Sequence, residues 1–160
     1  MNAPAARIAF ALERYADVHE ECRPLHCAQW PETMGLHTPG DADPDYDTII
    51  ELEERGVIYL FTARLNNTLV GLMSYMLGDC LQQQGKLTAT EMGLWIDPRC
   101  REKKLAVNLL TYAEDALRQL GVDYISLSDK GPAGGISLSL LADHLGYTPA
   151  SITYTKVLEK

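Results

Sequence analysis

Apolar residues recur at helical spacing in the first part of the chain. Residues 5–12 are apolar enough to form a first strand or the start of a helix. Residues 15–34 predict an amphipathic helix, because their apolar members fall roughly on one face. Proline removes a backbone donor, so we expect this helix to be kinked or split at Pro24 and Pro31. The apolar members of the face are Val18, Cys22, Leu25 and Trp30.

A loop and a short helix follow. Residues 35–46 are punctuated by Gly, Pro and Asp, which is typical of a connecting loop. Asp47 is the expected N-cap of a helix over residues 48–55, because an Asp side chain accepts from the first free backbone N–H groups. Gly56 is expected to close this helix, since glycine readily takes the conformation that ends one.

Three strands come next. Residues 57–65 and 68–77 are rich in apolar and β-branched side chains, and Asn66-Asn67 separates them. Asn tolerates the left-handed conformation of a tight turn, so this pattern predicts a β-hairpin. Residues 86–96 form a third long apolar-rich run. Together these runs predict an antiparallel meander.

The pattern then changes to helical spacing over residues 105–120, and Gly121 marks the end of that helix. Residues 123–129 predict a short strand, so the region forms a strand–helix–strand unit with parallel strands and a right-handed crossover. The helix is expected to bury one face, which carries Leu105, Leu109, Tyr112, Ala113, Ala116, Leu117 and Leu120.

A last helix over residues 136–146 and a last strand over 151–159 complete the order of elements. This order predicts an α/β fold whose mixed central sheet combines an antiparallel meander with a parallel βαβ unit, flanked by helices. With 160 residues, of which 46% are hydrophobic and 22% charged, we expect residues 1–160 to form a single domain.

Charge and cysteine content exclude some classes of function. The formal net charge of −8 argues against broad nucleic-acid binding and is compatible with a cationic amine substrate. No apolar run approaches the roughly 18 residues of a membrane helix, and no secretory pattern is recognisable, so we expect a cytoplasmic protein without a membrane partner. Four cysteines without a CxxC pair predict no metal site.

A basic loop is the most informative feature of the chain. After Asp97-Pro98 the sequence reads Arg99-Cys100-Arg101-Glu102-Lys103-Lys104 and then enters the helix over 105–120. A helix N-terminus presents unpaired backbone N–H groups and the positive end of the helix dipole, which together favour phosphate. The basic side chains strengthen this field, while Glu102 opposes it. The alternative is an ordinary strand-to-helix connection with solvated charges.

The element order and this loop resemble the GNAT family, the Gcn5-related N-acetyltransferases, over nearly the whole chain. The acetyl-CoA motif of the family is a strand followed by Arg/Gln-x-x-Gly-x-Gly/Ala and a helix. Arg101 and Ala106 match this motif, whereas Lys104 stands in place of its central glycine. Asp97-Pro98 and the late segment Leu145-Gly146-Tyr147 are also similar to the family.

The resemblance implies that acetyl-CoA is the acyl donor. Backbone amides of the loop would hold its pyrophosphate, and main-chain groups of the preceding strand would hold its pantetheine arm. Glycine at position 104 would let the backbone approach closely. Lys104 must therefore adopt a backbone conformation open to lysine and point its side chain outward. The candidate cofactor-binding residues are Leu94, Trp95, Ile96, Arg101, Glu102, Lys103, Lys104, Leu105 and Ala106.

Catalytic candidates also follow from the resemblance. Family members often place a glutamate on the strand before the loop, and Glu91 lies there among apolar and small residues. Partial burial would raise its pKa toward the range of a useful base, acting directly or through water. The alternative is a glutamate in a structural hydrogen bond. Ala142 replaces the tyrosine that usually serves as general acid, so Ser139 is the candidate in its place, with Ser137 beside it.

The acceptor site of the family is built by the first two helices, their loop and the central hairpin. Trp30 and Tyr75 are the candidate substrate residues there. The acidic loop could attract a cationic amine, or it could simply be solvated; its carboxylates are Asp41, Asp43, Asp45 and Asp47.

These features predict an acyl-CoA-dependent N-acyltransferase that moves acetyl from acetyl-CoA directly to a primary amine of a small molecule or protein. The family resemblance leaves a homodimer open. One alternative is a GNAT-fold binding module that has lost catalysis, since Lys104 and Ala142 depart from the family pattern. Another is transfer to a nucleic-acid amine, which would need a basic groove around Arg99, Arg101, Lys103 and Lys104.

Overall fold

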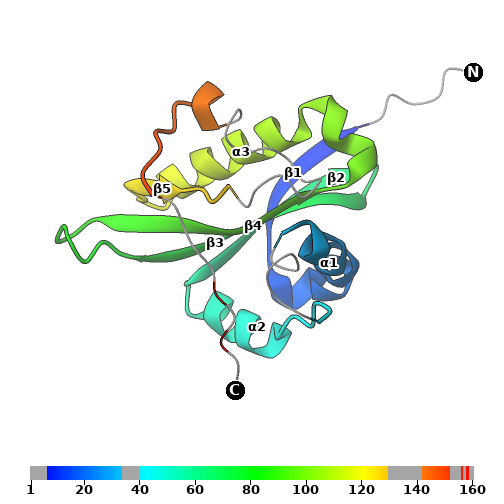
Figure 1. The fold of residues 1–160 in the computed structure, drawn as a ribbon, viewed down its shortest axis with the longest axis horizontal. Coiled ribbons are helices and arrows are strands. Elements are labelled where there is room, and N and C mark those ends of the chain that lie inside the picture. Colours follow the sequence, from blue (N-terminus) through cyan, green and yellow to red (C-terminus); the bar gives the residue numbers. More distant parts are fainter. Residues whose placement is uncertain (1–6, 34–39, 130–141, 152–155, 157, 159–160) are drawn as a thin grey trace, which may run out of the picture.

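The computed structural model describes residues 7–33, 40–129, 142–151, 156 and 158 (Figure 1). Its strands form one sheet in the order β1-β2-β3-β4-β5. None of the helices in these ranges is long and apolar enough to cross a membrane. The elements are β1 (Ile8–Glu13), α1 (Tyr15–Gln29), η1 (Trp30–Glu32), α2 (Tyr46–Glu54), β2 (Ile58–Leu65), β3 (Thr68–Asp79), β4 (Leu87–Ile96), η3 (Pro98–Lys103), α3 (Leu105–Gln119) and β5 (Tyr124–Ser126).

The sheet is mixed, as predicted. Strands β1 to β4 pair antiparallel, and β4 pairs parallel with β5. The predicted turn at Asn66 and Asn67 is confirmed, because these residues have φ values of 49° and 68°. The pairing of β4 with β5 stops at Thr90 and Ser126, so β5 is shorter than the predicted 123–129. A gap therefore opens between the two strands toward the C-terminal end of β4.

Helices cover both faces of the sheet: α3 lies across one face, and α1 and α2 lie on the other (Figure 1). Leu120 was expected on the buried face of α3 but is 42% exposed, because it caps the helix instead of belonging to its last turn. The α3 face holds the larger apolar cluster, which includes Phe61, Met73, Tyr75, Ile96, Leu105, Leu109 and Leu117. The α1 face holds a smaller cluster, which includes Tyr15, Val18, Cys22, Leu60, Leu72 and Trp95.

The predictions about the first helices are confirmed only in part. Helix α1 is not split at Pro24, which is exposed, whereas the predicted split at Pro31 is confirmed, because α1 ends at Gln29 and the separate 3₁₀ turn η1 holds Pro31. The N-cap of α2 is Asp45, whose carboxylate accepts from the Thr48 N–H at 3.1 Å and from the Thr48 hydroxyl at 2.7 Å. Asp47, the predicted cap, lies inside the first turn, where its negative charge favours the helix dipole.

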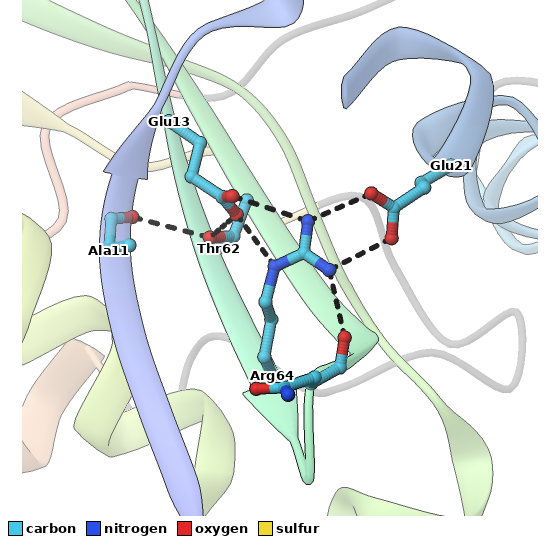
Figure 2. A network of polar contacts seen from close by, with 6 residues as sticks. Ala11, Glu13, Glu21, Thr62 and Arg64 are labelled. Atoms are coloured by element: carbon cyan, nitrogen blue, oxygen red, sulfur yellow. Dashed lines mark hydrogen bonds and ion pairs between the residues drawn. The ribbon is translucent and has the colours of Figure 1, made fainter. Parts of the chain in front are cut away.

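The first half of α1 is fastened to the sheet by ionic contacts (Figure 2). Arg64 of β2 binds Glu21 of α1 at 2.8 Å and Glu13 of β1 at 3.0 Å. Hydrogen bonds to Glu21 and then Glu13 raise the pKa of Arg64, so its charge is fixed. Glu53 of α2 accepts from the backbone N–H of Tyr15 at 2.6 Å and so caps the start of α1. These contacts hold the beginning of α1, whereas its C-terminal end is held differently.

Candidate active site

The turn between η3 and α3 takes a conformation that suits an anion site. Lys104 has φ 54° and ψ 21°, the left-handed conformation that the glycine of the acetyl-CoA motif takes easily. The side chain of Lys104 is exposed and forms no cap hydrogen bond. The first N–H groups of α3 lack partners within the helix, as in any α-helix. The requirement placed on Lys104, a backbone conformation open to lysine, is therefore met.

Two arginines of the basic loop form ion pairs with carboxylates of the protein. Arg99 binds Asp97 with 2.5 Å between Nη2 and Oδ2, and this hydrogen bond is the main cause of the lowered pKa of Asp97. Arg101 donates from Nε to the Ile96 carbonyl at 3.0 Å and from Nη2 to Glu32 of η1 at 2.6 Å. Arg101 therefore joins the loop to the segment after α1. For Glu102 and Lys103 the structure describes the backbone only, in η3.

Next to the gap, a β-bulge in β4 changes the face of the sheet on which the following side chains lie. Ser74 pairs with Gly93 and Tyr75 pairs with Glu91, so Met92 is the extra residue. Tyr75 belongs to the cluster beneath α3, and Glu91 beside it is only 4% exposed. The Glu91 carboxylate accepts from the Ser128 backbone N–H at 3.3 Å, just past the end of β5. Glu91 therefore lies at the gap, on the α3 side.

Main-chain groups of β4 point toward the gap at alternate residues. The Leu94 carbonyl accepts from Gln29 Nε2 at 3.1 Å, and the Ile96 carbonyl accepts from Arg101. Because N–H and C=O of one strand residue point the same way, both residues direct their main chain away from β3. Trp95 alternates with them and pairs with Leu72, so its main chain faces β3. Its indole packs on the α1 side, and the buried Nε1 has no hydrogen-bond partner within the described part of the chain.

A cavity of about 500 Å³ opens on the α1 side of the bulge. Its walls come from both ends of α1, from η1, from the loop before α2 and the first turn of α2, and from the middle of β3 and β4. Its lining includes Tyr15, His26, Gln29, Trp30, Ser74 and Gly93. Asp41 and Asp43 also line it, which gives the mouth negative charge.

Burial sets the charge state of two groups in this cavity. His26 Nδ1 is hydrogen-bonded to the Tyr46 hydroxyl at 2.7 Å, and burial lowers the pKa of His26 to about 4. Burial also raises the pKa of Tyr15, and a hydrogen bond with Ser74 only partly offsets this effect. Both side chains are therefore neutral near pH 7. Arg23 lies over the Tyr46 ring, 5.0 Å from its centroid, and approaches Asp43 to 3.6 Å.

The structure brings some of the predicted site residues together and separates others. Trp30 lines the cavity, and its Nε1 donates to the Gly40 carbonyl at 2.9 Å. Tyr75 and Glu91 do not line it, because both face α3. The Tyr75 hydroxyl is buried and has no partner among the residues described. Ser139 and Ser137 lie outside the described residues.

Sequence reasoning missed His26, Gln29 and Glu32. His26 and Gln29 are three residues apart and therefore share a helix face. Polar residues at the end of an amphipathic helix are usually solvated, so nothing in the local pattern distinguished them. Their role depends on which strand the end of α1 meets.

Comparison with known proteins identifies the family. Residues 16–147 match the model of the acetyltransferase (GNAT) family. The chain belongs to the GNAT acetyltransferases. This match confirms the resemblance noted in the sequence and the expectation of an acetyltransferase fold and class. No curated protein sequence is significantly similar to this member of the family.

Solved structures agree on the fold at low sequence identity. An aminoglycoside acetyltransferase from an uncultured soil metagenomic sample, in complex with sisomicin, is 14% identical and has a TM-score of 0.75, with 95% of this chain and 97% of that chain covered. The ribosomal-protein-alanine N-acetyltransferase from Brucella melitensis biovar Abortus 2308 is 17% identical, with a TM-score of 0.68 and coverage of 96% and 100%. An aminoglycoside N-acetyltransferase in complex with CoA is 17% identical, with a TM-score of 0.68 and coverage of 98% and 99%.

Proposed function

We propose that this GNAT protein transfers acetyl from acetyl-CoA directly to a primary amine. The observation that carries the proposal is Lys104, which takes the left-handed conformation of the motif glycine at the start of α3. The backbone there can present its amides to a pyrophosphate without glycine. Because the resemblance to the family breaks at this residue, its conformation is the most direct support for a working donor site.

The donor would lie along the gap between β4 and β5. Amides of residues 101–106 would hold the pyrophosphate, and the gap-facing main chain of Leu94 and Ile96 would bind the pantetheine arm. When bound, acetyl-CoA supplies a thioester that is activated toward attack by an amine. Trp95 contributes to this site through packing, since its main chain pairs with β3.

The acceptor would enter the cavity on the α1 side. Asp41 and Asp43 at its mouth attract a cationic amine, and Trp30 offers an apolar wall. His26 is neutral near pH 7 because of burial, so it does not repel a cationic amine. These features fit a small, positively charged amine; some structural neighbours act on aminoglycosides.

The transfer requires balanced bond changes. The amine nitrogen forms a bond to the acetyl carbon, the carbon–sulfur bond breaks, and CoA leaves as a thiolate that takes up one of the two protons lost by the cationic amine. The other proton is removed before the attack, because only the neutral amine is a nucleophile. Glu91 is our candidate acceptor of that proton. It faces α3 and borders the gap, so it would receive the proton through water.

The alternatives lose support from the same geometry. Lys104 was one of two reasons for expecting an inactive binding module, and its conformation removes that reason. Of the four basic residues that would form a groove for nucleic acid, Arg99, Arg101, Lys103 and Lys104, two are ion-paired within the protein: Arg99 binds Asp97 and Arg101 binds Glu32. Ala142, at the position of the usual acid, lies in the last described helical turn and remains a departure from the family.

Thermal unfolding with CoA tests the donor site. CoA at 100 times its Kd adds about 2.7 kcal/mol to the free energy of unfolding, which raises Tm by about 5–10 °C in a chain of this size. A panel of amines with acetyl-CoA then tests turnover by thiol release. Glu91→Gln should lower turnover about 100-fold while keeping the CoA shift. An unchanged Tm at saturating CoA contradicts the proposed function.

A further inference from the structure

The C-terminal end of α1 is attached to the edge of β4 that the donor would use. Gln29, the last residue of α1, donates from Nε2 to the Leu94 carbonyl at 3.1 Å. Glu32 of η1 binds Arg101 at 2.6 Å, and Arg101 in turn donates to the Ile96 carbonyl at 3.0 Å. Both gap-facing carbonyls of this edge thus have protein donors.

Gly93 allows Gln29 to come this close. A Cβ built on Gly93 would lie 2.9 Å from Gln29 Nε2 and 3.1 Å from its Oε1, closer than ordinary van der Waals contact. The Gln29 amide therefore lies directly against the β4 backbone, beside the bulge. Because Gln29 and Gly93 also line the acceptor cavity, one side chain borders both halves of the site.

The Glu32–Arg101 ion pair and the Gln29–Leu94 hydrogen bond differ in how easily water or a ligand can replace them. The Glu32–Arg101 pair is charged, and its side chains are only 24% and 20% exposed, so it holds η1 firmly. The Gln29 bond is a single neutral hydrogen bond, which has a small net value because water or another donor replaces it readily. Only the Gln29 side chain needs to rotate for the Leu94 carbonyl to become free.

We propose that Gln29 is a latch on the donor gap, which acetyl-CoA must displace. This inference rests on the proposed function. The arm of the donor uses the Leu94 carbonyl and the space against Gly93, both of which Gln29 occupies. The released amide turns into the acceptor cavity, where it presents a donor and an acceptor to the amine. Gln29 is thus a positioning residue, because its amide enters the acceptor cavity only when the donor site is occupied.

Isothermal titration with CoA alone tests the latch without knowledge of the acceptor. Gln29→Met keeps the length and volume of the side chain but removes the N–H group that donates the hydrogen bond. Gln29→Ala removes this N–H group and most of the side-chain volume. Each should bind CoA about two- to tenfold more tightly than the wild type, since one neutral hydrogen bond no longer competes. Gln84→Ala, in the exposed β3–β4 turn, is the matched control and should keep the wild-type Kd.

The outcomes separate the latch from a structural role and from the proposed function. Equal or weaker CoA binding by Gln29→Met overturns the latch, even where Gln29→Ala binds more tightly, because volume alone would then explain the gain. A fall in Tm without a gain in affinity also overturns it, since Gln29 would then only stabilise α1. A wild-type protein that does not bind CoA contradicts the proposed function itself.

Discussion

On one face of the sheet the buried residues of α3 span the whole helix, whereas on the other face the buried residues of α1 all lie in its first half. Both helices have 15 residues. The buried residues of α3 are Leu105, Ala106, Leu109, Leu110, Ala113 and Leu117, which span the helix. The buried residues of α1 are Tyr15, Val18 and Cys22, all of which precede Pro24.

This difference divides the site into a fixed part and an adaptable part. The donor turn at Lys104 is held by backbone conformation and by the core beneath α3. The acceptor wall is held by side-chain hydrogen bonds, such as those of Gln29 and His26, and these can exchange with ligands.

The largest expected effect is on stability, through matched leucines of the two helices. Leu109 of α3 is fully buried, so Leu109→Ala should lower the free energy of unfolding by about 2–5 kcal/mol. Leu25 of α1 is only partly buried against the smaller cluster, so Leu25→Ala should cost about 1 kcal/mol. Urea unfolding of both variants measures the difference. Equal losses would show that α1 is packed as firmly as α3.

Much of the α3 side could be predicted from the sequence because its signals are local. The spacing of Leu105, Leu109 and Leu117 defines the helix, and its expected bounds, 105–120, differ from those observed by one residue. The turn that we propose to bind phosphate is also contiguous, from Asp97 to Ala106. A helix face and a loop at its start need no knowledge of distant contacts.

The α1 side could not be predicted in the same way. Gln29 meets Leu94, which is 65 positions further along the chain, so its role depends on tertiary packing. Glu91 was predicted as the catalytic base, and the bulge at Met92 determines that it faces α3 and not the cavity. One extra residue reverses the side on which a strand residue lies, and no signal in the local pattern marks it.

The next effect concerns the pH dependence of stability through His26. Its pKa falls from 6.5 to about 4 in the folded state because of burial, so the unfolded state binds a proton first as pH falls. Its contribution is fully present above about pH 6.5 and is lost as pH falls toward 4, by about 2–3 kcal/mol. Urea unfolding of wild type and His26→Gln between pH 7 and pH 4 measures this term.

The variant Tyr46→Phe identifies the cause. It removes the hydroxyl bonded to His26 Nδ1 but leaves an aromatic ring over the imidazole. Since burial is the cause of the lowered pKa, this variant should keep most of the pH dependence. Parallel curves for wild type and His26→Gln would mean that the imidazole is solvated, and the acceptor wall would then be more open than described.

The smallest effect tests the fixed side at Lys104. Lysine in the left-handed conformation carries a steric cost that glycine avoids, although glycine also gains entropy in the unfolded chain. Lys104→Gly should therefore raise the free energy of unfolding by about 0.5–1 kcal/mol relative to Lys104→Ala, which loses the same charge but keeps the strain. Urea unfolding of the pair measures conformation separately from charge. Should Lys104→Gly be no more stable than Lys104→Ala, the turn would not be held in the left-handed conformation. The donor side would then be adaptable as well, and the contrast between the two faces of the sheet would disappear.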